Sequence, residues 1–406
     1  MPQIILTGMT VLLCACCLAV GGFWVAVAFH VARTMAFHPT ARRGLRLPAP
    51  DPAPRVCIVI PAHNEETVIG TVAASLRAQD YPAFRVVFVL DRCTDRTEDI
   101  LRDALAGDVR FEVLILKACP EGWAGKVHAV HRGIADSSAA RDAELLLFAD
   151  ADTCFDPGCV RACVSLMLER RLDMLSLLST LTARSWFERV VQPAAAFELA
   201  RQYPLLRAGR NDDRRRAFAN GQFLLFRADA YRALGGHEAV HDELLEDLAL
   251  ARRAADLRLR AGVFLADGVL LCRMYADWAS FGRGWRRIYT EGAKRKPSRL
   301  RAAARVPLLF GAIGPALVLL ATLLGLLLAP GTRASALLAI GLSASVACLA
   351  GLVSVFLSSR SPLVYLPCYP LGSFLVWRIL IRAARDLERG APTVWGGRSY
   401  QRPVRR

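Results

Sequence analysis

Apolar and polar positions divide the chain into long apolar runs at both ends and a mixed segment between them. The first 29 residues contain no Lys, Arg, Asp or Glu, and residues 4–29 exceed the roughly 20 apolar residues that cross a bilayer core. Two further unbroken apolar runs cover residues 306–328 and 334–357. The pattern predicts four parts: a membrane anchor over 1–31, a globular domain over 32–305, a transmembrane and interfacial region over 306–381, and a basic tail over 382–406.

The N-terminal run fits a retained anchor better than a cleaved signal peptide. A signal peptide has a basic start and an apolar run of about 7–15 residues, whereas here no Lys or Arg precedes a much longer run. The first basic residues follow the run, at Arg33, Arg42, Arg43 and Arg46. By the positive-inside rule, we expect a multi-pass protein of the cell membrane whose globular domain lies in the cytosol.

The last apolar run, residues 362–381, is interrupted by Pro367 and Pro370 and carries Arg378 near its end. If this run crossed the bilayer, the basic tail would lie outside, against the charge rule. We therefore expect a broken or interfacial segment that returns to the cytosolic side.

The middle segment alternates short apolar runs with amphipathic stretches. Strands are predicted over residues 55–61, 84–90, 111–116 and 144–149, and helices over 66–79 and 94–106. Runs of β-branched and other apolar residues without alternation are typical of parallel strands that are buried on both faces. The order predicts an α/β fold with a doubly wound, mostly parallel sheet, flanked by transmembrane helices.

Composition narrows the class of protein. The 406 residues are 54% hydrophobic, carry a net charge of +16 and have a mean hydropathy of +0.31. This apolar content excludes a disordered chain, and the 12 cysteines are too few for a disulfide scaffold of this length. Part of the charge lies in Arg207, Arg210, Arg214, Arg215 and Arg216, which we expect to attract anionic lipid headgroups, with no nucleic-acid partner.

Polar residues follow three of the predicted strands. They are His63, Asn64 and Glu65; Asp91 and Asp95; Asp150 and Asp152. A single Asp after a strand usually caps a helix or forms a turn, but three acidic strand ends meet at one edge of a parallel sheet. Clustered carboxylates repel, so the pattern predicts a bound cation with a phosphate-bearing ligand. Oxygen ligands favour Mg²⁺ or Mn²⁺ over zinc. The usual phosphate-loop sequences are absent, and Lys126 after Gly125 is the nearest phosphate-binding element.

A second pattern points to a different chemistry. Residues 237–241 read H-E-x-x-H, the zinc motif of metalloproteases when it lies on a helix. The strand-end acids have no role in that reading, so it is the weaker alternative. Glu246 and Asp247 begin an amphipathic helix, where they either complement the helix dipole or supply a catalytic base.

Taken together and in this order, these motifs resemble family 2 glycosyltransferases with the GT-A fold. The resemblance rests on residues 61–66, 91–95, Gly125-Lys126, the D-x-D of Asp150 and Asp152, residues 220–222 and 235–237, and Glu246-Asp247. The segments 273–275, 284–285 and 395–400 look like those of hopanoid-associated and carotenoid-type membrane glycosyltransferases. The family's chemistry is a direct displacement with inversion at the anomeric carbon of a UDP- or GDP-sugar.

The resemblance also implies roles for individual residues. Pro61, Asn64, Glu65 and Asp91 would line the nucleoside pocket, Lys126 and Asp150 would lie near the nucleotide and sugar, and Asp152 would hold the metal. Asp247, beside Glu246, would be the general base, and the acceptor would meet Gly236, His237 and Trp285.

Two features of the sequence bear on the acceptor. The segments 185–191 and 278–289 mix aromatic residues with arginines, either as ordinary packed helices or as interfacial segments that bring a lipid acceptor to the site. The Gln-x-x-Arg-Trp signature of polymer synthases is missing, which favours transfer of a single sugar. A processive polysaccharide or polyprenyl-phosphate sugar synthase remains the alternative, and a catalytically inert membrane partner is a third class.

Overall fold

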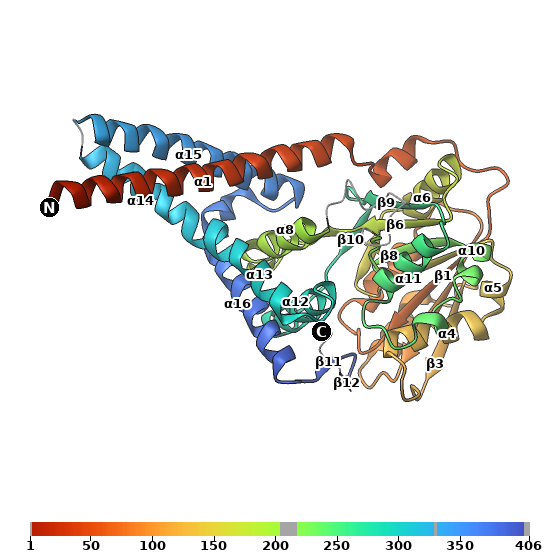
Figure 1. The fold of residues 1–406 in the computed structure, drawn as a ribbon. Coiled ribbons are helices and arrows are strands. Elements are labelled where there is room, and N and C mark those ends of the chain that lie inside the picture. Colours follow the sequence, from red (N-terminus) through yellow and green to blue (C-terminus); the bar gives the residue numbers. More distant parts are fainter. Residues whose placement is uncertain (1, 204–216, 329–330, 402–406) are drawn as a thin grey trace.

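The computed structural model describes residues 2–203, 217–328 and 331–401, which form an α/β domain joined to a bundle of long helices (Figure 1). The arginine cluster between residues 207 and 216 lies outside the described residues, so its predicted contact with lipid headgroups stays a prediction.

A seven-stranded sheet in the order β3-β2-β1-β4-β8-β6-β9 forms the centre of the α/β domain. Its strands are β1 (Val56–Ala62), β2 (Phe84–Asp91), β3 (Phe111–Leu116), β4 (Leu145–Ala149), β6 (Met174–Leu178), β8 (Phe223–Arg227) and β9 (Ala261–Leu265). Neighbouring strands are parallel except β8, which runs antiparallel to both β4 and β6. The four predicted strands are all present, and the predicted mostly parallel sheet is confirmed.

Helices cover both faces of this sheet, as the buried strands require. Along β1, Ile58 and Ile60 belong to one core and Cys57 and Val59 to the core on the opposite face, because successive side chains of a strand alternate. The first core includes residues of α2 (Ile69–Arg77), α3 (Thr97–Leu105) and α6 (Cys159–Glu169). The second includes residues of α4 (Gly125–Asp136), α10 (Ala228–Ala233) and α11 (Glu246–Asp256).

Short elements complete the domain. A second sheet contains β5 (Thr153–Phe155), β10 (Leu270–Cys272) and β7 (Thr180–Leu181). The remaining pieces are η1 (Ala41–Arg46), α5 (Ser138–Arg141) and η3 (Glu238–Val240). A C-terminal hairpin is formed by β11 (Thr393–Trp395) and β12 (Arg398–Tyr400).

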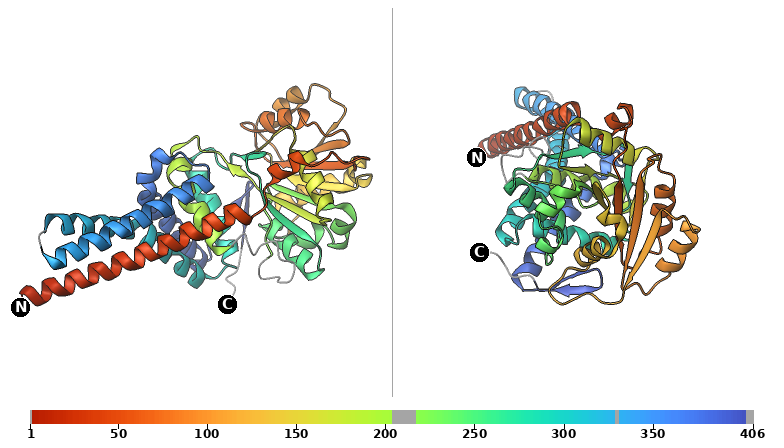
Figure 2. Two further views of the ribbon diagram at one scale, coloured as in Figure 1. Left: turned by 90° about the horizontal axis from the view of Figure 1, so that it is seen from above. Right: turned by 90° about the vertical axis from the view of Figure 1, so that its right-hand side faces the viewer.

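The second part of the molecule is helical. It contains α1 (Pro2–Phe37), α7 (Trp186–Val190), α8 (Gln192–Gln202), α12 (Trp278–Gly292), α13 (Pro297–Val306), the π-helical η4 (Pro307–Ile313), α14 (Gly314–Leu327), α15 (Thr332–Ser358), η5 (Leu363–Cys368) and α16 (Tyr369–Glu388). Among the described residues, four helical stretches are long and apolar enough to cross a membrane: Thr7–Phe37, Pro297–Leu327, Thr332–Ser358 and Leu363–Glu388. Helices α1, α14 and α15 project together away from the α/β domain (Figures 1 and 2).

The helix boundaries differ from the sequence predictions at both ends of the chain. Helix α1 continues to Phe37 instead of ending near residue 31, so it reaches the edge of the α/β domain as one rod. The predicted break at the prolines is the 3₁₀ turn η5, after which α16 is continuous to Glu388. Figure 1 shows α16 turned steeply away from the direction of α1 and α15. Whether it crosses or lies on a membrane stays a prediction.

The long helices pack through small residues against a buried tryptophan. Trp24 of α1 is 0% exposed and its indole N–H donates to the carbonyl of Phe310 at 3.1 Å. Gly351 of α15 lies directly against it, since a Cβ built at Gly351 would meet Trp24 Cε3 at 2.6 Å and the Trp24 carbonyl oxygen at 2.8 Å. A residue without a side chain is therefore needed for α1 and α15 to approach this closely.

We predict that Gly351→Ala destabilises the helix bundle by about 1–3 kcal/mol, because the added methyl group overpacks the contact with Trp24. Gly22→Ala is the matched control, since a Cβ at Gly22 meets nothing within 4 Å. Thermal unfolding of the purified protein in detergent should show a lower Tm for Gly351→Ala and no loss for Gly22→Ala. Equal Tm values for the two variants would contradict this packing.

Candidate functional site

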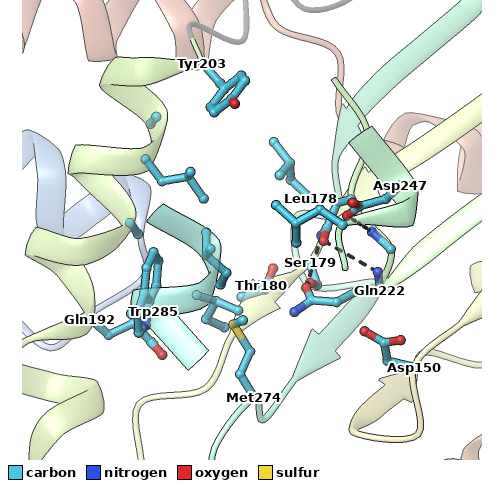
Figure 3. Close-up of a pocket in the computed structure, with 18 of the residues that line it drawn as sticks. Asp150, Leu178, Ser179, Thr180, Gln192, Tyr203, Gln222, Asp247, Met274 and Trp285 are labelled. Carbon is cyan, nitrogen blue, oxygen red and sulfur yellow. Dashed lines mark hydrogen bonds between the residues drawn. The ribbon is translucent and has the colours of Figure 1, made fainter. Parts of the chain in front are cut away.

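A single large cleft, about 1410 Å³ in volume, opens at the carboxyl ends of β1, β2 and β4. The predicted residues Pro61, Asn64, Glu65, Asp91, Lys126, Asp150, Asp152, Glu246, Asp247 and Trp285 all line it. In Figure 3, Asp150, Gln222 and Asp247 lie on the sheet side, and Trp285, Gln192 and Tyr203 face them from helical segments across the cavity. The acidic groups that are scattered in the sequence therefore meet in one place.

Lys126 joins two of the acids at the base of the cleft. It lies in the first turn of α4, and its Nζ is 2.6 Å from Asp150 Oδ1 and 2.6 Å from Glu246 Oε1. Burial disfavours the charged amine, but the two carboxylates outweigh it and raise the Lys126 pKa. Gly221 packs closely against this ion pair, because a Cβ there would lie 3.0 Å from Lys126 Nζ and 3.2 Å from Glu246 Oε1.

Two other carboxylates in the cleft, Asp152 and Glu65, have no ion-pair partner among the described residues. Burial, together with the charge of Asp150, raises the pKa of Asp152 to about 7. Burial and the charges of Asp152, Asp150 and Asp95 raise the pKa of Glu65 to about 8. Asp152 Oδ1 accepts only a weak hydrogen bond from the Cys272 thiol at 3.4 Å. The cleft therefore has a deficit of positive charge around Asp152 and Glu65.

Glu246 and Asp247 are adjacent in the sequence but lie in different environments. The Lys126 ammonium overcomes the effect of burial on Glu246 and lowers its pKa. Burial and the negative charge of Glu246 raise the pKa of Asp247 to about 6. Asp247 is held in place by backbone N–H groups, with Gly221 donating to Oδ2 and Leu248 donating to Oδ1, both at 2.7 Å. Asp247 is thus the oriented carboxylate that can take up a proton near neutral pH.

The predicted nucleoside residues form a tight loop cluster beyond β1 and β2. Asp91 is 3% exposed, and its carboxylate is held bidentately by Arg92, with Nε to Oδ1 at 2.9 Å and Nη2 to Oδ2 at 2.6 Å. His63 Nδ1 donates to the backbone oxygen of Asp91 at 2.6 Å. Asn64 Oδ1 accepts from the backbone of Thr94 at 2.8 Å. Asp95 does not join the acidic cluster at the base of the cleft, because its oxygens accept from Thr97 and the Glu66 backbone near the start of α3.

The carboxylates fit a divalent cation that a ligand helps to hold. Among the described residues, no three His, Cys, Asp or Glu side chains are grouped so as to hold a metal by themselves. Mg²⁺ commonly binds one or two carboxylates plus substrate phosphates. Asp152, with its neighbour Asp150, offers such a partial set, and burial together with the charge of Asp150 raises its pKa.

The H-E-x-x-H segment does not form a metal site. It folds as a 3₁₀ turn, not as the α-helix that places the two histidines on one face. His237 is 2% exposed, and its Nδ1 lies 2.8 Å from the Tyr231 hydroxyl, whereas His241 is exposed. The metalloprotease alternative therefore fails.

Two of the predicted acceptor residues, Gly236 and His237, do not reach the large cleft. Neither Gly236 nor His237 is among the residues that line the large cleft, and His237 instead lines a small void beside Lys126 and Glu246. Gly236 instead packs against Tyr231, so Trp285 is the one of the three predicted acceptor residues that lines the cleft.

Two aromatic residues of the cleft, both from segments that carry the family resemblance, have buried polar atoms without a hydrogen-bond partner among the described residues: Tyr275 Oη and Trp285 Nε1. The apolar part of the lining, which the sequence did not indicate, includes Phe23, Val27 and Val31 of α1 and Phe197 of α8. No local motif marks these residues, because helical segments distant in the sequence bring them to the strand ends.

Comparisons with known proteins identify the family of this chain. Residues 53–273 match the family described as Glycosyltransferase like family 2. The 4,4'-diaponeurosporenoate glycosyltransferases of Staphylococcus aureus strains MRSA252 and USA300 are 26% and 25% identical over 359 residues, covering 84% of this chain and 87% of theirs.

Among solved structures, the mannosyltransferase PcManGT from Pyrobaculum calidifontis, in complex with GDP-Man and Mn²⁺, is similar in fold. Its TM-score is 0.50 at 18% identity, over 93% of this chain and 99% of that one. The segment that matches the family, residues 53–273, spans more than half of this chain and contains every strand of the central sheet. The protein belongs to the family 2-like glycosyltransferases and has their GT-A fold.

Proposed function

We propose that this protein transfers one sugar from a nucleotide-sugar to a lipid acceptor, with inversion at the anomeric carbon and with the help of Mg²⁺ or Mn²⁺. One observation carries the proposal: the same cleft is lined by the carboxylates of the α/β domain and by apolar side chains of α1 and α8. Its volume exceeds the roughly 300–1,000 Å³ of an ordinary small-ligand pocket, which leaves space for a donor and part of a lipid.

The donor end would bind the nucleotide-sugar through the residues already placed around it. Pro61, Asn64 and Glu65 would meet the nucleoside, with the paired Asp91 and Arg92 behind them, and Lys126 and Asp150 would lie beside the sugar and phosphates. Asp152 would hold a divalent cation, which stabilises the charge of the departing diphosphate when bound. The relative's complex with GDP-Man and Mn²⁺ supports a donor and a cation of these classes.

Asp247 would be the general base. A hydroxyl oxygen of the acceptor attacks the anomeric carbon, the bond to the nucleoside diphosphate breaks, and the hydroxyl proton passes to Asp247. Two backbone hydrogen bonds fix the position of this carboxylate, and its pKa of about 6 leaves it ionised at pH 7 but basic enough to accept a proton. Glu246 would act indirectly, by holding Lys126 in place.

The apolar end of the cleft favours a lipid acceptor. Its walls come from α1 and α8, and α1 contains one of the four candidate membrane spans, so a lipid would reach the site from the bilayer surface. The predicted interfacial segments form α7 and α12, which meet where the Trp186 and Trp278 rings lie 5.1 Å apart. The Tyr275 hydroxyl and the Trp285 indole N–H would then orient the acceptor's polar head. The relatives named for a carotenoid acid support an acceptor of this class. We place the α/β domain in the cytosol, where nucleotide-sugars are made available.

We predict a glycosylated lipid in membranes that contain this protein. Mass spectrometry of lipid extracts, after incubation with a panel of UDP- and GDP-sugars, should show one or more lipids heavier by a single sugar. Products with several added sugars would indicate the polymer-forming alternative. Transfer to a soluble acceptor at the full rate, with no modified lipid, would contradict the lipid assignment.

We predict that Asp247→Asn lowers kcat by about 10²–10⁴-fold, because the amide cannot accept the proton. Nucleotide affinity should stay unchanged, since the amide oxygen can still accept from Gly221. In the wild type, kcat/KM should fall about tenfold per pH unit below pH 6, where Asp247 becomes protonated.

The matched control is Asp242→Asn, which removes the same charge from an exposed residue outside the cleft lining. It should keep both the rate and the pH profile of the wild type. Near-normal turnover by Asp247→Asn would refute the base assignment.

We predict that binding of Mn²⁺ together with UDP or GDP releases protons at pH 7. The raised pKa values of Asp152, about 7, and Glu65, about 8, mean that at pH 7 Asp152 is about half protonated and Glu65 is mostly protonated before binding, and a cation favours their charged forms. Calorimetry in buffers of different ionisation enthalpy measures this release, which should vanish above about pH 9 and decrease in Asp152→Asn. Equal proton release by wild type and Asp152→Asn would remove Asp152 from the cation site.

A further inference from the structure

The C-terminal hairpin lies far from the family's motifs in the sequence but returns to the nucleotide end of the cleft. Strands β11 and β12 pair through Trp395 and Arg398, with Gly396 and Gly397 as the two-residue turn. Both glycines have positive φ, +54° and +68°, as the turn type that best fits a tight hairpin requires. The hairpin is therefore a defined element of the fold.

Hydrogen bonds tie the hairpin to the elements that carry the donor residues. Arg398 Nη1 donates to the backbone oxygens of Pro120 and Trp123, both at 3.2 Å, in the loop that leads into α4. The Tyr400 hydroxyl accepts from the backbone N–H of Gly125, next to Lys126, at 3.1 Å. These contacts fix the hairpin on the side of the cleft where Lys126 and Asp91 lie.

The turn also contacts the predicted nucleoside residues. Arg92, the partner of Asp91, donates to the Gly396 carbonyl at 3.4 Å. Gly397 lies against His63, since a Cβ there would be 2.8 Å from His63 Nε2. The Nδ1 of this histidine donates to a carbonyl, so Nε2 is the ring nitrogen left to accept a hydrogen bond beside the turn.

Trp395 brings an aromatic ring and a paired cation to the same place. The Arg287 guanidinium carbon lies 4.5 Å from the centroid of the Trp395 ring. Arg287 Nη1 donates to the Leu244 carbonyl at 2.6 Å, but its buried Nε has no partner among the described residues. Trp395, Gly396, Gly397 and Arg287 all line the cleft. Indole rings stack on nucleobases, and guanidinium groups bind phosphate oxygens.

From this juxtaposition we infer that the C-terminal hairpin is the outer wall of the donor pocket and that Trp395, with Arg287, contacts the nucleoside diphosphate. The inference rests on the proposed function, because it names further residues of the same donor site. The Trp-Gly-Gly turn would form one side of the donor pocket, next to the side formed by the loops that carry His63 and Asp91.

The test compares alanine substitutions at the two turn glycines of the full-length protein. Both positions have positive φ and bear the same backbone strain, but a Cβ at Gly396 meets nothing within 4 Å, whereas one at Gly397 collides with His63. Gly397→Ala should therefore displace the turn, and Gly396→Ala should not. Calorimetry with UDP and with GDP, each with Mn²⁺, measures the nucleotide Kd of both variants and of the wild type.

We expect Gly397→Ala and Trp395→Ala each to weaken binding of the preferred nucleotide by roughly tenfold. This factor is at the lower end of the range for loss of one base-stacking contact. Gly396→Ala should weaken binding by less than about twofold. A chain that ends at residue 391 should lose at least as much affinity, with Tm values confirming that each variant is folded. Unchanged affinity in Gly397→Ala and Trp395→Ala would overturn the inference while leaving the proposed function intact. Tighter binding by the shortened chain would mean that the hairpin blocks the pocket, which also overturns it. If the wild type binds neither nucleotide, the proposed function fails and the inference fails with it.

Discussion

The ion pair of Lys126 with Asp150 and Glu246 is the interaction on which the site depends. It links the end of β4 to the start of α11 through one ammonium group in the first turn of α4. Without this cation, the acids that converge here would repel one another. With it, one net negative charge remains among these three groups, and Asp152, Glu65 and Asp247 lie close by with pKa values raised by burial and by neighbouring charges. Among the described residues, no cation forms an ion pair with any of these three acids.

The unequal environments of these acids explain how one cleft can perform several tasks. Glu246 stays ionised because the nearby Lys126 ammonium lowers its pKa, and its ion pair holds Lys126 in place. Asp247, the next residue, faces the cavity without a cation and is oriented by the backbone of Gly221 and Leu248. Groups whose pKa values are pushed apart in this way are typical of acid–base sites. Asp152 lies in a third environment, beside a thiol and another acid, which favours an added cation.

Much of the fold follows from the sequence because the central strands are buried on both faces. The apolar runs of β1, β2 and β4 are diagnostic, and the acids that follow them had to meet at one edge of a parallel sheet. The environment of each acid was not predictable. Arg92, which has a left-handed backbone conformation, pairs with Asp91. Tyr231 holds His237 out of the cleft, although the local sequence resembles a zinc motif. The C-terminal hairpin packs against the loop before α4, which is distant in the sequence, and no local pattern indicates this contact.

The helical part also contributes to the cleft, since apolar side chains of α1 and α8 line it. We propose that a divalent cation, which arrives with a nucleoside diphosphate, balances the charge of the acids around Asp152. The most direct measurement is an experimental structure of the protein with Mn²⁺ and UDP or GDP, using anomalous scattering to locate the manganese. The account predicts the metal within about 2.0–2.6 Å of an Asp152 oxygen and in contact with the diphosphate. Manganese bound elsewhere, or a diphosphate bound with the Asp152 carboxylate still directed at Cys272 and no metal beside it, would contradict the account.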